Sequence, residues 1–162
     1  MSEILTKISS YDLFNNLFPG TLFIVLAEKL LNIPLIQESV LVGIFLYYFV
    51  GMIISRFGSL IIAPILKKIK LAKFEDYKDY ISASKLDDKI DLLSQINNTY
   101  RTIISMLILL LLLKLYLFIE SYIQFLQDYR IIILLFSLIV MFIFSYKKQT
   151  KFITKRIKAS KK

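Results

Sequence analysis

The chain has 162 residues, of which 57% are hydrophobic, and its mean hydropathy of +0.65 is too high for a soluble domain of this size. It contains no cysteine and no histidine, which excludes disulfides and thiolate chemistry and removes the most common general base and metal ligand. The formal net charge of +9 would indicate nucleic-acid binding in a soluble protein, but here the charges flank apolar runs, so no specific nucleic-acid binding is expected.

Four apolar runs of about membrane-spanning length divide the chain, with a long polar interval between the second and the third. This pattern predicts an all-α, polytopic membrane protein in which four transmembrane helices form two hairpins around a helical cytosolic insert. The expected segments are an N-terminal amphipathic segment with the first hairpin (1–58), the insert (59–101), the second hairpin (102–146) and a basic cytosolic tail (147–162).

The basic residues indicate how the spans are oriented. Nine of the 21 lysines and arginines lie within 56–101 and eight within 147–162. Because the positive-inside rule places such segments in the cytoplasm, we expect a multi-pass protein of the bacterial inner (cytoplasmic) membrane with both termini cytoplasmic. No signal peptide is expected, since Lys7 is the only basic residue before the first run and no small-residue cleavage pattern follows that run.

The first span is predicted to begin near Pro19, after an amphipathic helix at 4–14, and to end near residue 33. About fifteen residues give roughly 22 Å of helix, which is short of the ~30 Å hydrocarbon layer. Two explanations fit: the helix extends back through Phe14 with a kink at Pro19, or the bilayer thins around it. Glu28 lies near the outer end of this run.

The second span, 40–55, carries a stripe of small residues on one helical face that continues just beyond it. Its members are spaced four or eight positions apart: Gly43, Gly51, Ser55 and Ser59. Small side chains let two helix backbones approach closely, so we expect this face to mediate helix packing, either within the chain or between subunits. Beyond it the helix is expected to continue, kinked at Pro64, along the inner membrane surface.

The insert contains interleaved acidic residues and lysines, which favour solvated, salt-bridged surfaces over a metal site or an acid–base pair. A helix is predicted to begin at Asp87 and to run without a break into the third span. A polar cluster marks the point where this helix enters the membrane: Asn97, Asn98, Tyr100 and Arg101. Together they suit an interfacial belt, in which the two amides either pair with another helix or contact water.

Lys114 is the one charge well inside the third span, 103–119. An unpaired lysine in the bilayer is unfavourable, so three roles remain open: pairing with Glu28, lining a pore, or extending its ammonium to the outer surface. After the fourth span, 131–146, the tail has no acidic residue and is expected to bind anionic lipids. The residues assigned to that contact are Lys147, Lys148, Lys151, Lys155, Arg156 and Lys158.

No nucleophile–base pair, phosphate-binding loop, dinucleotide fingerprint or zinc-ligand spacing occurs in the sequence. Catalytic, cofactor-binding and metal-binding residues are therefore not predicted, and the protein is not expected to be an enzyme. The expected partners are a bilayer containing anionic lipids, further copies of the same chain in a homo-oligomer, and a cytosolic protein.

Three short motifs stand out: YD-x-x-x-x-L-x-PG at 11–20, R-x-GSLII-x-P at 56–64 and NNTYRT at 97–102. They resemble segments of small four-span bacterial inner-membrane proteins. Some proteins of this form lie beside phage-defence genes, where four-span subunits act as membrane effectors or sensors. The resemblance implies such a role for this chain, and it brings no catalytic residue with it.

Three functions are compatible with this layout. A homo-oligomeric pore-forming or membrane-perturbing effector is favoured, because the spans are short, one face is lined by small residues and little soluble material is present. A membrane anchor or scaffold would instead recruit a cytosolic partner through the insert and the basic tail. A holin-like lysis protein would share the small size and the basic tail.

Overall fold

The computed structural model describes residues 12–160 of the chain. Helix accounts for 84% of these residues and no strand occurs among them, which confirms the all-α prediction. Three helical segments are long and apolar enough to cross a membrane: Val40–Lys68, Lys89–Glu120 and Arg130–Ala159. The arrangement of four spans as two hairpins stays a prediction, and the predicted amphipathic helix at 4–14 lies almost entirely outside the described residues.

The first predicted span corresponds to α3 (Phe18–Leu31), which is not among those three segments. At 14 residues it measures about 21 Å along its axis. It ends at Asn32, whose φ of 56° is left-handed, a conformation that asparagine adopts more readily than most residues. The helix therefore stops before Pro34. At its other end it is continuous with the π-helical turn Leu13–Leu17, so the helix extends back through Phe14, the first of the two explanations that the sequence left open.

The next helix, α4 (Val40–Phe57), packs along α3, and two glycines allow this close contact. A Cβ atom at Gly20 would lie 1.9 Å from the carbonyl oxygen of Tyr47. A Cβ atom at Gly51 would lie 1.8 Å from the carbonyl oxygen of Asn16. Since no side chain fits at either position, glycine is required for the two backbones to approach this closely.

Two π-helical turns interrupt the helices, and a proline follows each of them. They are η1 (Leu13–Leu17), which precedes α3, and η2 (Gly58–Ile62), which joins α4 to α5 (Ala63–Lys68). In η2 the amide of Ala63 donates to the carbonyl of Gly58, five residues back. The next donor in this register would be Pro64, which has no N–H, so the carbonyl of Ser59 is left for another donor. Where the sequence predicts a kink, the structure thus has a wider turn within one helical segment.

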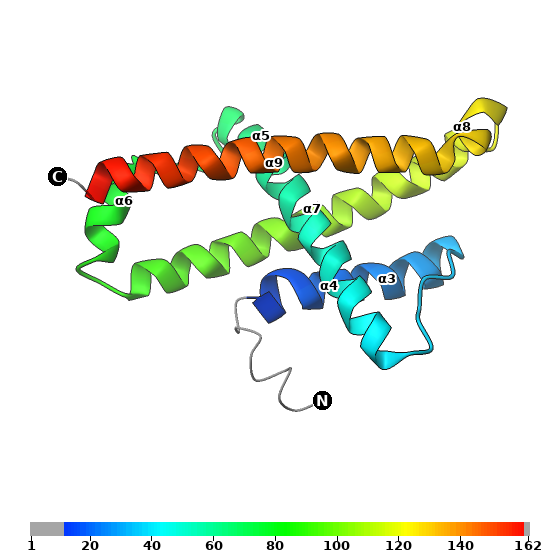
Figure 1. Cartoon of the computed structure of the whole chain (residues 1–162), viewed down its shortest axis with the longest axis horizontal. Helices are drawn as coiled ribbons and strands as arrows, with labels where there is room; N and C mark the ends of the chain where they lie inside the picture. Colours follow the sequence, from blue (N-terminus) through cyan, green and yellow to red (C-terminus); the bar gives the residue numbers. More distant parts are fainter. Residues whose placement is uncertain (1–11, 161–162) are drawn as a thin grey trace.

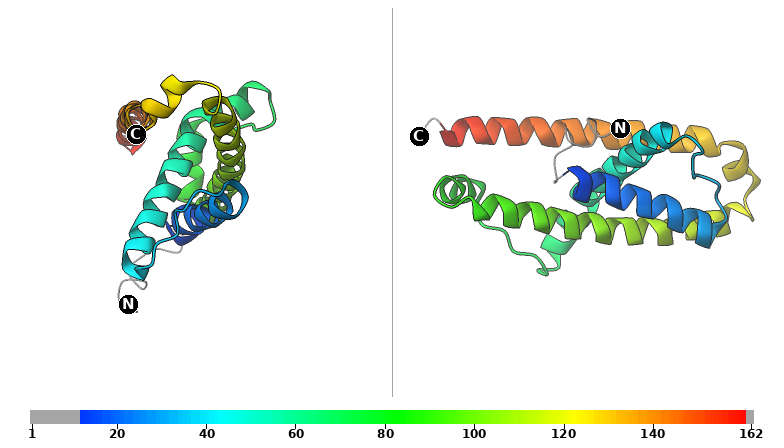
Figure 2. Two further views of the ribbon diagram at one scale, coloured as in Figure 1. Left: turned by 90° about the vertical axis from the view of Figure 1, so that its right-hand side faces the viewer. Right: turned by 90° about the horizontal axis from the view of Figure 1, so that it is seen from below.

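The insert and the second half of the chain form four helices: α6 (Tyr77–Ser84), α7 (Lys89–Glu120), α8 (Gln124–Asp128) and α9 (Arg130–Ser160). The continuous α7 confirms that the helix of the insert runs unbroken into the third apolar run. The chain turns at α8, and α9 returns in the opposite direction (Figure 1). α7 and α9 are held apart for much of their length, and α4 passes between them and contacts both (Figure 2).

The buried core lies where α3, α4 and α7 meet. Its largest buried apolar side chains are Ile24, Ile54 and Met106, each only 1% exposed. α9 contributes much less, because 6% of its most apolar window is buried, against 22% for each of the other two membrane-length segments. Most of the apolar surface of α9 can therefore contact lipid or another protein.

The helix α6 contacts the start of α7 and the basic end of α9. The Tyr80 hydroxyl donates a hydrogen bond of 2.7 Å to the carboxylate of Asp91 on α7. That bond, together with partial burial, raises the pKa of Tyr80 above its usual value. The ring of Tyr77 lies 5.7 Å from the ring of Phe152 on α9, measured between centroids. The tail is therefore a helical continuation of the fourth apolar run that packs on the insert.

Candidate functional site

A buried polar cluster lies in the bundle between η1, α4 and α7. Asn15 is only 3% exposed, and its side-chain amide donates to the Ser55 hydroxyl and to the Asn16 carbonyl oxygen Oδ1, both at 3.1 Å. The fully buried Thr102 hydroxyl lies 2.9 Å from Oδ1 of Asn15. Because these groups satisfy one another, the cluster fixes how three segments distant in sequence meet.

Lys148 approaches this region from α9. Its ammonium donates to the hydroxyl of Ser59 at 2.8 Å and also to the Ser59 carbonyl. That carbonyl is the one that Pro64 leaves without a helical donor. Lys148 therefore fastens α9 to η2, although it is one of the first residues after the fourth apolar run.

A cleft of about 740 Å³ lies between the polar cluster and Lys148. Four basic residues line it: Arg56, Lys67, Arg101 and Lys148. Asp12 is the acidic residue in its lining, and its carboxylate accepts hydrogen bonds from the Tyr48 hydroxyl and the Asn16 amide, both at 3.3 Å. The cleft therefore carries a marked excess of positive charge, which favours an anion.

The predicted polar cluster at the start of the third span is divided by the structure. Asn98 and Arg101 line the cleft, and the Asn98 carbonyl accepts a hydrogen bond of 2.9 Å from the Thr102 hydroxyl. Asn97 and Tyr100 are exposed and lie outside the cleft lining. Thr102 is the last residue of the NNTYRT motif but was not assigned to the polar cluster, and its position four residues after Asn98 was the available signal.

The small residues of the predicted stripe contact different segments of the same chain and do not form one continuous packing face. Gly51 and Ser55 pack against η1, and Ser59 binds Lys148. A Cβ atom at Gly43 would lie 3.3 Å from the ring of Tyr47, a residue of the same helix. In the described part of the chain, the closest helix contact therefore depends on Gly51 together with Gly20, which sequence reasoning did not include.

The structure does not bring Glu28 and Lys114 together as an ion pair. The Glu28 carboxylate accepts hydrogen bonds from the backbone amides of Leu35 and Ile36, at 3.3 Å and 2.9 Å. Glu28 thereby holds the loop after α3, whereas Lys114 is exposed on α7. Counting residues along each span predicted a common depth, but it could not predict which way either side chain points.

Sequence reasoning also missed an ion pair at the opposite end of α7. Glu120 is only 3% exposed, and both of its carboxylate oxygens lie 2.7 Å from nitrogens of the Arg130 guanidinium. The Tyr116 hydroxyl donates to the same carboxylate at 3.1 Å. This two-point contact fixes the corner at which α8 connects α7 to α9.

The six residues predicted to bind anionic lipids are also divided. Lys148 lines the cleft and is half-buried. The others are exposed along α9: Lys147, Lys151, Lys155, Arg156 and Lys158. They remain candidates for a diffuse contact with a charged surface, whereas Lys148 is held in a defined position by Ser59.

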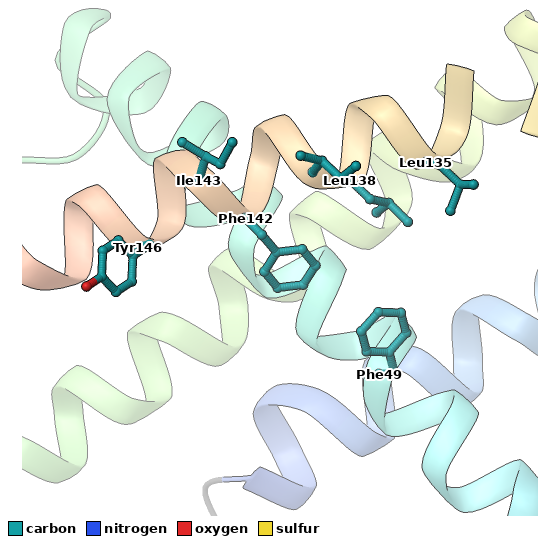
Figure 3. Close-up of a pocket in the computed structure, with 7 residues that line it drawn as sticks. Phe49, Leu135, Leu138, Phe142, Ile143 and Tyr146 are labelled. Atoms are coloured by element: carbon teal, nitrogen blue, oxygen red, sulfur yellow. The ribbon is translucent and has the colours of Figure 1, made fainter. Parts of the chain in front are cut away.

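A second hollow is entirely apolar. It has a volume of about 500 Å³ and lies between Phe49 of α4 and a face of α9 (Figure 3). Phe142 points across it toward Phe49, and the two rings stack with centroids 6.2 Å apart. Tyr146 has the one polar side-chain group among its lining residues, and no polar surface faces the hollow, so the basic cleft is the stronger candidate site for a polar ligand.

Comparison with known proteins identifies no relative. No protein-family model, no curated protein and no solved structure matches the chain. The resemblance of the three short motifs to four-span bacterial membrane proteins stays an expectation, and the functional argument rests on three membrane-length helices and the basic cleft between them.

Proposed function

We propose that this protein is a homo-oligomeric pore-forming or membrane-perturbing effector of the bacterial inner membrane, with both termini in the cytoplasm. A role in phage defence follows only from the motif resemblance. The observation that carries the proposal is α9, a helix of membrane length whose most apolar window is only 6% buried within its own chain. Such a helix is available to pack against copies of itself.

α9 carries a regular exposed apolar seam, part of which lines the apolar hollow beside Phe49. Its members follow one another at spacings of four and three residues and are each at least 59% exposed: Ile132, Phe136, Ile139 and Ile143. That spacing keeps one face turned toward a partner helix over several turns. Ile153 lies in the same register after Tyr146 and the polar Thr150, and it is 52% exposed among the basic residues of the tail. Beyond the apolar run the bilayer core would not cover this residue, which favours a protein partner.

The test compares two double variants of the full chain in vesicles of phosphatidylethanolamine and phosphatidylglycerol. Phe136→Ala with Ile143→Ala shortens the seam. Leu134→Ala with Phe144→Ala removes side chains of the same size from exposed positions outside it. Chemical crosslinking reports the oligomer, and release of a trapped small dye, compared with a trapped large dextran, reports permeability.

We expect the unaltered protein to crosslink into oligomers and to release the dye. The seam variant should lose both properties by roughly tenfold, because it loses helix-packing contacts at two positions. The control variant should behave like the unaltered protein. A monomeric protein that leaves vesicles intact would contradict the proposal.

The same experiment distinguishes a second function, a membrane anchor that recruits a cytosolic protein. The observation that favours it lies in the insert, where Leu71 and Leu86 are 75% and 90% exposed although neither lies in an apolar run. An anchor would leave vesicles sealed whatever the state of the α9 seam. Its recruitment of a partner would instead depend on the insert, so Leu86→Ser would abolish it.

A further inference from the structure

Three basic residues that border the apolar runs meet in one place. Arg56 directly follows the second run, Arg101 lies shortly before the third, and Lys148 lies just after the fourth. All three line the basic cleft, and the charges of the two arginines repel the Lys148 ammonium. If the apolar runs lie in the hydrocarbon layer, the cleft lies at the depth of the lipid headgroups.

Neither Arg56 nor Lys148 forms an ion pair with a carboxylate in the described part of the chain. Lys148 has three N–H donors, and its two hydrogen bonds to Ser59 leave one for a ligand. Asp12, the acidic residue of the lining, accepts hydrogen bonds from Tyr48 and Asn16. Half-buried and without a carboxylate partner among the described residues, the positive charges of Arg56 and Lys148 favour an anion from outside the chain.

The chemistry of the cleft selects a phosphate group. Each guanidinium can offer two parallel donors to phosphate oxygens, and the ammonium adds a compact charge. A volume of about 740 Å³ is much larger than an inorganic ion needs, and it leaves room for the group that carries the phosphate. We propose that Arg56, Arg101 and Lys148 bind the phosphate of an anionic phospholipid headgroup in this cleft.

This site differs from a diffuse attraction of the tail to a charged surface. The ammonium of Lys148 is held by Ser59, and Arg101 lies one residue from Thr102 in the buried polar cluster. The ammonium of Lys148 and the backbone of Arg101 are therefore held in place before a ligand binds, which lowers the entropic cost of binding. The proposal does not depend on pore formation, since a monomer would contain the same site.

The experiment measures lipid binding to the full chain in detergent by native mass spectrometry. The probes are phosphatidylglycerol, zwitterionic phosphatidylcholine and the soluble headgroup glycerol 3-phosphate. Arg56→Gln and Lys148→Gln each remove one charge from the cleft. Lys151→Gln and Lys155→Gln remove one charge each from exposed positions of α9 outside it. Thermal melting followed by circular dichroism shows whether each variant is folded. Arg56→Gln breaks no contact to Ser59, so it tests the site even if Lys148→Gln fails to fold.

We expect phosphatidylglycerol to bind roughly tenfold more tightly than phosphatidylcholine, and each folded cleft variant to lose most of that preference. The two controls should stay within about twofold of the unaltered protein, because exposed charges are screened. Glycerol 3-phosphate that binds as tightly as the lipid would assign the site to a soluble phosphate ester, overturning the lipid as its source. Equal losses in cleft and control variants, or equal binding of both lipids, would overturn the site itself.

Discussion

The absence of a side chain at Gly51 sets the distance between α4 and η1. Gly51→Ala would place a Cβ atom 1.8 Å from the carbonyl oxygen of Asn16, and backbone atoms cannot move aside as a side chain can. We expect this substitution to reduce the free energy of unfolding by about 1–3 kcal/mol, the usual cost of overpacking. Titration with a denaturing detergent, followed by circular dichroism, would measure it.

Gly43→Ala is the matched control on the same helix. Its Cβ atom would meet only the ring of Tyr47, at 3.3 Å, and that ring can rotate slightly. Because alanine favours helix over glycine by up to about 1 kcal/mol, Gly43→Ala should be neutral or stabilising. Equal destabilisation by the two substitutions would mean that the close contact at Gly51 does not determine the packing.

Pro19 and Pro64 predict where a helix is interrupted, but they do not predict the form of the interruption. Both were readable as interruptions of a helix, since neither can donate a backbone hydrogen bond. The form of the interruption, a π-helical turn in each case, depends on the contacts around it. In η2 the Ser59 carbonyl, which lacks a helical donor, accepts a hydrogen bond from Lys148 of another helix. Nothing near Pro64 in the sequence predicts that Lys148 is the donor.

At the scale of helices, the corner between α7 and α9 depends on Glu120. Glu120→Gln removes the charge that both Arg130 nitrogens contact at 2.7 Å and replaces one accepting oxygen by a donor. We expect the variant to melt a few degrees lower, a modest effect because the Arg130 side chain is 58% exposed and partly solvated. Thermal melting of the full chain in detergent is the measurement.

Asp128→Asn provides the comparison for this corner. Asp128 accepts a hydrogen bond of 2.9 Å from Gln124 on the exposed side of α8, and an asparagine oxygen can accept it equally well. Its melting temperature should match that of the unaltered chain. If Glu120→Gln also melts unchanged, the turn at α8 is held by its backbone hydrogen bonds rather than by the ion pair.

The positions of the helices could largely be predicted from the sequence, whereas the contacts between helices could not. The apolar run and the polar segment before it contain no proline or glycine from Asp87 to Glu120, so α7 could be predicted as one helix. Hydropathy likewise located most of α4 and α9, but it could not predict that α9 stays nearly uncovered. The sequence assigned Arg101 to the interfacial cluster and Lys148 to the tail, and Arg56 is the first residue of the basic interval 56–101. Their convergence follows from the crossing of three helices, for which no local sequence signal exists.

At the scale of the whole molecule, the buried polar cluster fixes the position of the start of α3 relative to the end of α4. Asn15 bonds to Ser55 and Thr102, so the start of α3 lies level with the end of α4 and with the cleft. If α4 crosses the bilayer, its first residues must then lie on the side opposite to the cleft. This would make η1 and α3 together a fourth crossing, shorter than the other three segments.

Single cysteines test this arrangement directly, because the natural chain has none. The exposed positions Glu38, Lys85 and Gln124 lie before α4, just after α6 and in α8. With a membrane-impermeant maleimide on intact cells, we expect Glu38→Cys and Gln124→Cys to react and Lys85→Cys to react only after the membrane is permeabilised. The positive-inside distribution requires this result if four helices cross. Labelling of Gln124→Cys while Glu38→Cys stays protected would show that α3 and the start of α4 remain within the membrane, and the four-span arrangement would be wrong.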